Sequence, residues 1–119
     1  MGLKHIRCWY KVLLEKYRHD LAFLKAMADQ TVKDFDRFNY TVVFNDNLPI
    51  QFNSYLIQLT EQLKEWCKHD GARIPGLLYH IDLPEHLLPV RYGCRDVGRL
   101  SELILQRELI KVVMRKLYS

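Results

Sequence analysis

The C-terminal segment, residues 96–117, is apolar on more than one side, and no other feature constrains the fold as strongly. Read as a helix, it carries two apolar stripes with Val113 between them: Leu103, Ile110, Met114 and Leu117 form one, and Leu105, Leu109 and Val112 form the other. A helix that is apolar on two sides must contact two partners. We therefore expect either the central helix of the fold or half of a dimer interface, with Leu105, Leu109 and Val112 as partner-binding residues.

Two earlier segments also repeat apolar residues every three or four positions, which predicts helices. The first runs from about residue 3 to about residue 37 without proline or glycine. A bend or break is expected near His19-Asp20 or Asp29-Gln30, because helices much longer than about 25 residues are unusual in compact domains. The second runs from about residue 50 to residue 69 and ends before Gly71, since glycine readily adopts the conformation that closes a helix.

The segment between the second and third helices is rich in proline and glycine, and it predicts a crossover with one short helical turn at 84–88. The predicted fold is therefore all-α, with three main helices (about 3–37, 50–69 and 96–117) in a single domain, residues 1–119. The first two helices are expected to pair antiparallel. An α+β alternative requires residues 40–44 to pair with 78–83, where apolar residues alternate as in a strand.

Length and composition are those of an ordinary globular chain: 119 residues, 49% hydrophobic and 27% charged. No apolar run approaches the roughly 20 residues that a transmembrane helix needs. The cysteines, Cys8, Cys67 and Cys94, are odd in number and widely spaced, so a disulfide framework is not expected and a cytoplasmic location is predicted.

Positive charge is concentrated near the C-terminus, because residues 91–119 carry the whole net charge of +4. Four cations of the last helix form a stripe: Arg107, Lys111, Arg115 and Lys116. Such a stripe is typical of a solvated face, of a surface that binds nucleic acid or another phosphate-bearing ligand, or of a contact with an acidic protein. The acidic partner can also be internal, in the cluster Asp29, Asp34 and Asp36.

Two His-Asp dipeptides, His19-Asp20 and His69-Asp70, are the strongest candidates for a metal site. If the first two helices are antiparallel, position 19 lies near position 70, and two imidazoles and two carboxylates are suitable ligands for a divalent metal. The alternative is that Asp70 ends a helix and that His19-Asp20 lies on a polar shoulder. We favour this second interpretation, and we expect no metal and no other cofactor.

His80 and Asp82 resemble a general acid–base pair, but no nucleophile or phosphate-binding loop accompanies them. No catalytic residue is assigned, and an enzyme is not favoured. The favoured function is a non-enzymatic interaction, adaptor or structural protein that binds a protein partner or a second copy through the C-terminal helix. The alternatives are a nucleic-acid-associated protein that uses the basic stripe and a small metal-dependent hydrolase that uses the His-Asp pairs.

Overall fold

The computed structural model describes residues 2–83 and 96–118, with side chains from Tyr10 onward. Its helices are α1 (Gly2–Tyr17), α2 (Leu21–Asp36), α3 (Phe52–His69), α4 (Ile74–Ile81) and α5 (Val97–Leu117). The predicted all-α class is confirmed. Residues 2–83 and 96–118 contain no strand, so the α+β alternative is wrong. The helical turn predicted at 84–88 lies outside the described residues.

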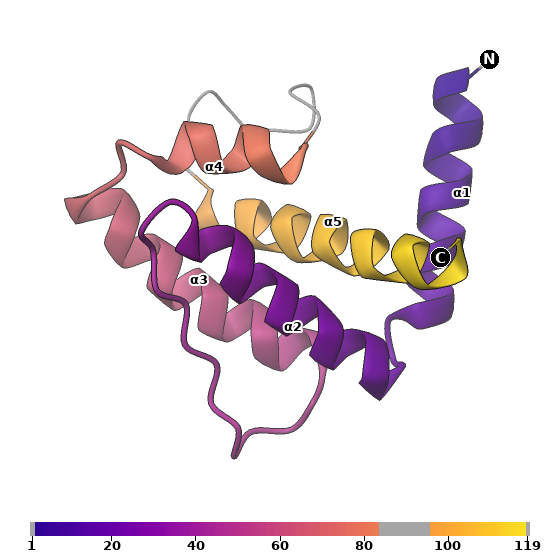
Figure 1. Ribbon diagram of the computed structural model, residues 1–119, viewed down its shortest axis with the longest axis horizontal. Coiled ribbons are helices and arrows are strands. Elements are labelled where there is room, and N and C mark those ends of the chain that lie inside the picture. The colour runs from indigo at the N-terminus through magenta and orange to yellow at the C-terminus, as the bar shows by residue number, and fades with distance from the viewer. Residues whose placement is uncertain (1, 84–95, 119) are drawn as a thin grey trace.

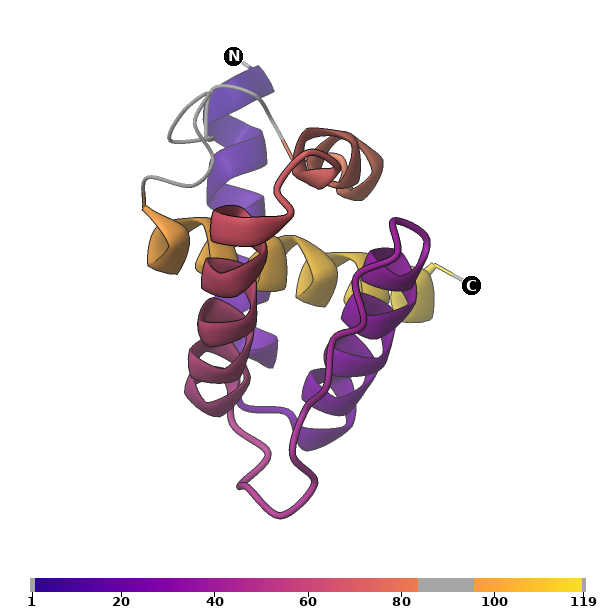
Figure 2. The same cartoon turned by 90° about the vertical axis from the view of Figure 1, so that its left-hand side faces the viewer.

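Helix α5 occupies the centre of the fold and packs against each of the other four helices (Figures 1 and 2). Its buried residues include runs of neighbours, such as Leu103 to Leu105 and Glu108 to Ile110, which point in different directions around the helix. Both Leu105 and Leu109 are 0% exposed. The prediction that this segment is enclosed on several sides is confirmed, and the enclosing elements belong to the same chain.

The first predicted helix, 3–37, is in fact two helices, and the break falls at His19-Asp20, one of the two positions expected from sequence. Asp20 has an extended backbone conformation, and its side chain accepts a hydrogen bond from the backbone N–H of Phe23 at 3.1 Å. An N-cap of this kind satisfies an N–H group that the start of a helix leaves without a partner. The cap therefore starts α2 in a new direction, at an angle to α1 (Figure 1).

The connector between α2 and α3 is extended and runs back along α3, antiparallel to it. The backbone of Val43 both donates to and accepts from the side chain of Gln62, and the N–H of Asn45 donates to Gln58. Two glutamine side chains thus supply the hydrogen bonds that a second strand would otherwise provide. Tyr40, at the start of the connector, is buried, and its ring lies 4.9 Å from that of Trp66 near the end of α3.

Because the connector returns to the level where α2 began, α2 and α3 run in the same direction (Figures 1 and 2). The aromatic contacts agree, since Phe35 near the end of α2 lies 5.7 Å, between ring centroids, from Trp66 near the end of α3. The predicted antiparallel pairing is therefore wrong. The physical reason is that the extended connector spans the length of a helix, where the prediction assumed a short turn.

Most of the segment 78–83, which sequence alternation suggested as extended, belongs instead to the short helix α4, Ile74–Ile81. Pro75 stands in its first turn, where a missing N–H costs nothing, and Asp82 closes it with a left-handed backbone, φ 68° and ψ 45°. The side chains that α4 buries follow helical spacing: Ile74, Leu77, Leu78 and Ile81. Gly76 lets α4 approach α2 closely, because a Cβ there would lie 3.2 Å from the ring of Phe38.

The radius of gyration is 14.0 Å, close to the value of about 13.5 Å expected for a compact domain of this length. The core surrounds α5 and is mostly aliphatic, and an aromatic group of Phe35, Tyr40 and Trp66 joins α2, the connector and α3. The hydroxyl group of Tyr40 donates a hydrogen bond to the backbone carbonyl of Asp70 at 2.6 Å, which fixes the connector to the end of α3.

Candidate functional site

Three ionisable side chains lie together where α2 packs against α5. Asp34 of α2 and Glu108 of α5 are only 2% and 0% exposed. Lys111 places its Nζ atom 2.8 Å from Oδ2 of Asp34 and 3.3 Å from Oε1 of Glu108. One ammonium group thus faces two buried carboxyl groups, which we call the Asp34–Glu108–Lys111 cluster.

The two carboxyl groups of this cluster differ in their affinity for protons. Burial raises the pKa of Glu108 to about 8, and the neighbouring Asp34 acts in the same direction, while Lys111 opposes the shift without cancelling it. Burial would also raise the pKa of Asp34, but hydrogen bonds from Glu108, Lys111 and Gln30, together with the lysine charge, outweigh it and lower that pKa. At neutral pH, Asp34 is therefore ionised and Glu108 is mostly a neutral acid.

The cluster continues on both sides through polar side chains of α2, α4 and α5. Gln30 donates to Oδ1 of Asp34 at 3.0 Å and accepts from Arg115 at 2.9 Å. On the other side, Nε2 of His80 lies 3.7 Å from Oδ1 of Asp34 and 3.3 Å from Nη1 of Arg37. Since arginine can only donate, the histidine Nε2 atom is the acceptor in this contact. The ring of His80 thus sits between Asp34 and Arg37, where α4 covers the end of α2.

The cations predicted to bind anions mostly contact groups of their own chain. Arg107 pairs with Asp82 at 3.2 Å, Lys111 belongs to the buried cluster, and Arg115 donates to Gln30. The internal acidic partner suggested by the sequence is Asp34. Lys116 lies on the exposed last turn of α5. Tyr10 of α1 lies near Arg107, and burial raises the pKa of its hydroxyl to about 12 although the charge of Arg107 opposes the shift.

The three residues predicted to bind a partner, Leu105, Leu109 and Val112, lie inside the core. They are 0%, 0% and 8% exposed, and the covering side chains come from this chain's own helices. Leu105 and Leu109 have no exposed surface, whereas Val112 also lines a groove between α2 and the end of α5. The sequence correctly indicated two buried sides for this helix, but it could not tell whether one chain or two would cover them.

The structure separates the two His-Asp pairs that were considered as metal ligands. Because α2 and α3 run in the same direction, His19-Asp20 lies at the beginning of α2 and His69-Asp70 at the end of α3 (Figure 1). Asp20 caps α2, while Asp70 pairs with Arg73 at 2.7 Å. Among the side chains of residues 10–83 and 96–118, no three of His, Cys, Asp or Glu are arranged to hold a metal ion.

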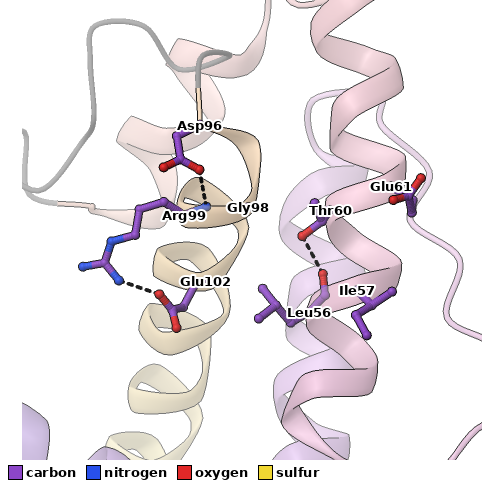
Figure 3. A pocket seen from close by; sticks show the side chains of 8 residues that line it. All are labelled: Leu56, Ile57, Thr60, Glu61, Asp96, Gly98, Arg99 and Glu102. Atoms are coloured by element: carbon purple, nitrogen blue, oxygen red, sulfur yellow. Dashed lines mark hydrogen bonds and ion pairs between the residues drawn. The ribbon is translucent and has the colours of Figure 1, made fainter.

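A groove lies between α3 and the first turns of α5 (Figure 3). Leu56, Ile57 and Thr60 of α3 line one wall, and Ile57 is 65% exposed. Across from them, Gly98 offers no side chain, so a Cβ at this position would meet only the carboxylate of Asp96.

Charged side chains surround this α3–α5 groove: Glu61, Asp96, Arg99 and Glu102. Arg99 is paired with Glu102, and the side chain of Asp96 accepts a hydrogen bond from the backbone N–H of Arg99. Glu61 has no ion-pair partner in the part of the chain that the structure describes. The rim therefore carries three acids and one base, although the chain as a whole has a net charge of +4.

A second groove lies between α2 and the end of α5, with Ala22, Phe23 and Ala26 on its α2 wall. Its rim carries both signs of charge: Asp20, Asp29, Lys33, Arg115 and Lys116. A rim of mixed charge does not select one class of charged partner, and Arg115 is already engaged with Gln30.

Sequence reasoning missed two parts of this arrangement. Glu108 was counted only as a charge, yet it directly precedes Leu109 and Ile110 in a segment that was predicted to be enclosed on two sides, and a carboxyl group buried there needs a partner. No local sequence pattern indicated the α3–α5 groove, because Ile57 and Asp96 come together only through the packing of α3 on α5.

Comparison with known proteins gives no relative for this chain: no family model, no curated protein and no solved structure matches it. Among the described helices, none combines the length and the apolar character needed to cross a membrane.

Proposed function

We propose that this protein is a non-catalytic interaction domain and that the α3–α5 groove binds an apolar, positively charged segment of a partner protein. The observation that carries the proposal is the exposure of Ile57 beside Leu56 in a groove with a mostly acidic rim. Contiguous exposed apolar surface that polar residues surround is typical of contact sites. An acidic rim on an otherwise basic chain favours a basic partner through charge complementarity.

The ionisable groups of the α2–α5 contact support the same conclusion. They are paired with one another inside a helix contact, where they hold α2, α4 and α5 together. Arg107, Lys111 and Arg115, which belong to the stripe that favoured nucleic-acid binding, likewise contact groups within the chain. We therefore assign partner binding to the side of α5 that faces α3, at the α3–α5 groove, and not to the side that packs against α2.

The test uses two fluorescent designed peptides, both helical with a leucine face, one carrying lysine and the other glutamate on the polar face. Binding is measured by anisotropy with wild-type protein and with Ile57→Ser. We expect the lysine peptide to bind and the substitution to weaken it about tenfold, since removing a buried isoleucine side chain loses about 1.5 kcal/mol. The glutamate peptide should not bind.

Val43→Ser is the matched control, because Val43 is 66% exposed, almost the same as Ile57, but lies on the connector between α2 and α3 and does not line the groove. This variant should bind the lysine peptide like wild type, whereas Glu61→Gln should weaken binding in low salt. Equal effects of Ile57→Ser and Val43→Ser would overturn the assignment of the groove. So would the absence of binding by the wild-type protein.

A further inference from the structure

Glu108 and Asp34 present a problem of charge balance in the centre of the molecule. Both carboxyl groups are almost completely buried, and Lys111 is the only lysine or arginine that forms an ion pair with either of them in the described part of the chain. Its Nζ atom is closer to Asp34, at 2.8 Å, than to Glu108, at 3.3 Å. Apart from the ionic contact of Oε1 with Lys111, neither oxygen of Glu108 accepts a hydrogen bond from the side chains and backbone described here. A buried carboxylate without a donor is strongly disfavoured, whereas a neutral acid in the same place can itself donate.

The surrounding elements offer no second positive charge to Glu108. Helix α2 contributes Asp34 and the neutral Gln30, and α5 contributes Lys111. Helix α4 contributes His80, whose Nε2 atom lies 3.7 Å from Oδ1 of Asp34 and 3.3 Å from Nη1 of Arg37. Arg107, the residue before Glu108, points to Asp82 on the outer side of α5, near Tyr10 of α1.

We propose that Glu108 and Asp34 hold one proton between them, and that release of this proton is a pH-sensitive switch in the contact of α5 with α2. With the proton, the acid of Glu108 donates to the carboxylate of Asp34 and Lys111 balances the single remaining charge. Without it, two carboxylates share one ammonium group in a site that excludes water. Repulsion between them then loosens the α2–α5 contact.

The direction of the pH dependence follows from the raised pKa of Glu108. Below the pKa of this group in the unfolded chain, Glu108 is protonated in both states and contributes nothing. Between that value and about 8, the folded protein keeps a proton that the unfolded chain releases, so stability falls as pH rises. Above about 8 both states have lost the proton, and the fall levels off. Asp34, whose pKa is lowered, contributes the opposite trend in acid only.

The main experiment compares wild type with Glu108→Gln, which keeps a donor for Asp34 but cannot ionise. Urea unfolding is measured from pH 5 to pH 9. We expect the unfolding equilibrium constant of wild type, relative to the variant, to rise about tenfold per pH unit up to about pH 8 and then to level off, because one proton is released on unfolding. Parallel pH profiles for the two proteins would overturn the proposal.

A second measurement reports on the folded state alone. In protein labelled with ¹³C at glutamate, the Glu108 carboxyl resonance should titrate near pH 8, together with backbone amides of α2 and α5 beside the cluster. In Glu108→Gln these amides should not titrate in that range. A Glu108 resonance that titrates near its ordinary value would also overturn the proposal, even if the stability profiles differ.

Two further variants keep the test decisive if Glu108→Gln does not fold. Asp34→Asn leaves Lys111 facing a single carboxylate, so Glu108 should ionise more easily and the fall in stability with rising pH should level off at a lower pH than in wild type. Glu102→Gln is the control, because Glu102 is a partly exposed acid of the same helix that pairs with Arg99. Its pH profile should follow that of wild type, and a profile altered as much as that of Asp34→Asn would contradict the assignment.

Discussion

Helix α5 is held on two sides by contacts of opposite chemistry. Toward α3 the buried side chains are apolar, with Leu59 and Leu63 on α3 both 0% exposed, and no ion pair joins the two helices within the described residues. Toward α2 the contact contains Asp34, Glu108 and Lys111, along with apolar side chains. The same helix thus combines a contact that is indifferent to pH with one that depends on a proton.

This difference shows how stability and specificity are divided in the fold. Apolar burial stabilises wherever shapes fit, and it tolerates small shifts between helices. A buried ion pair costs desolvation and often adds little net stability, but it penalises every arrangement that separates its members. We infer that the α3 side supplies most of the stability of α5, while the α2 side fixes its rotation and its position along the axis.

The largest effect is expected from Lys111→Met, which leaves both buried carboxyl groups without a cation. Breaking a buried charge pair by removing one member costs about 3 to 5 kcal/mol. The loss should be greater at pH 8 than at pH 5, where both acids can take up protons. Urea unfolding at the two pH values measures it. Lys64→Met, at an exposed position of α3, should change stability by less than about 0.5 kcal/mol.

A smaller and pH-independent effect is expected on the apolar side. Leu59→Ala should destabilise the protein by about 3 kcal/mol, because it removes a fully buried side chain and leaves a cavity. The loss should be equal at pH 5 and pH 8, since no group near it is expected to titrate. A clear pH dependence of this loss would show that the two contacts of α5 are coupled, which would contradict the division drawn above.

The smallest of the three effects concerns how α2 and α3 begin. Asp20→Ala removes the side-chain cap of α2 and should cost about 1 kcal/mol. Gln51, at the corresponding position before α3, makes no capping hydrogen bond, so Gln51→Ala should cost little. Thermal unfolding of the two variants measures the difference. Equal losses would mean that the turn at Asp20 is set by packing alone and that its cap contributes nothing.

The spacing of apolar residues predicted the helix bounds well where a single helix continued without a break. The ranges 50–69 and 96–117 differ from α3 and α5 by at most two residues at an end, because their apolar spacing and their flanking residues agree. The break at Asp20 was also consistent with the sequence, because aspartate is a favoured N-cap residue. The short helix α4 was missed because its residues alternate in polarity as well as following a helical repeat, and two periods compete in so short a segment.

The candidate sites were harder to predict from the sequence than the helices were. Arg107, Lys111 and Arg115 form a visible stripe, but whether such cations meet solvent, a ligand or an internal acid depends on which helix lies opposite. Asp34 was identified as one of three internal candidates, and only the antiparallel packing of α2 on α5 brought it to Lys111. The α3–α5 groove combines residues that are about 40 positions apart, so no local spacing indicates it.

The sequence by itself determined that the chain is helical and that residues 96–117 are enclosed, because periodicity and apolar content are properties of each segment alone. Only the tertiary structure decided which helices enclose α5, and that α2 and α3 run in the same direction. The direction depends on Val43 and Asn45 bonding to glutamine side chains of α3. Contacts between distant residues are decided by the packing of the whole chain, so they determine which charges are buried and which surfaces remain free to bind.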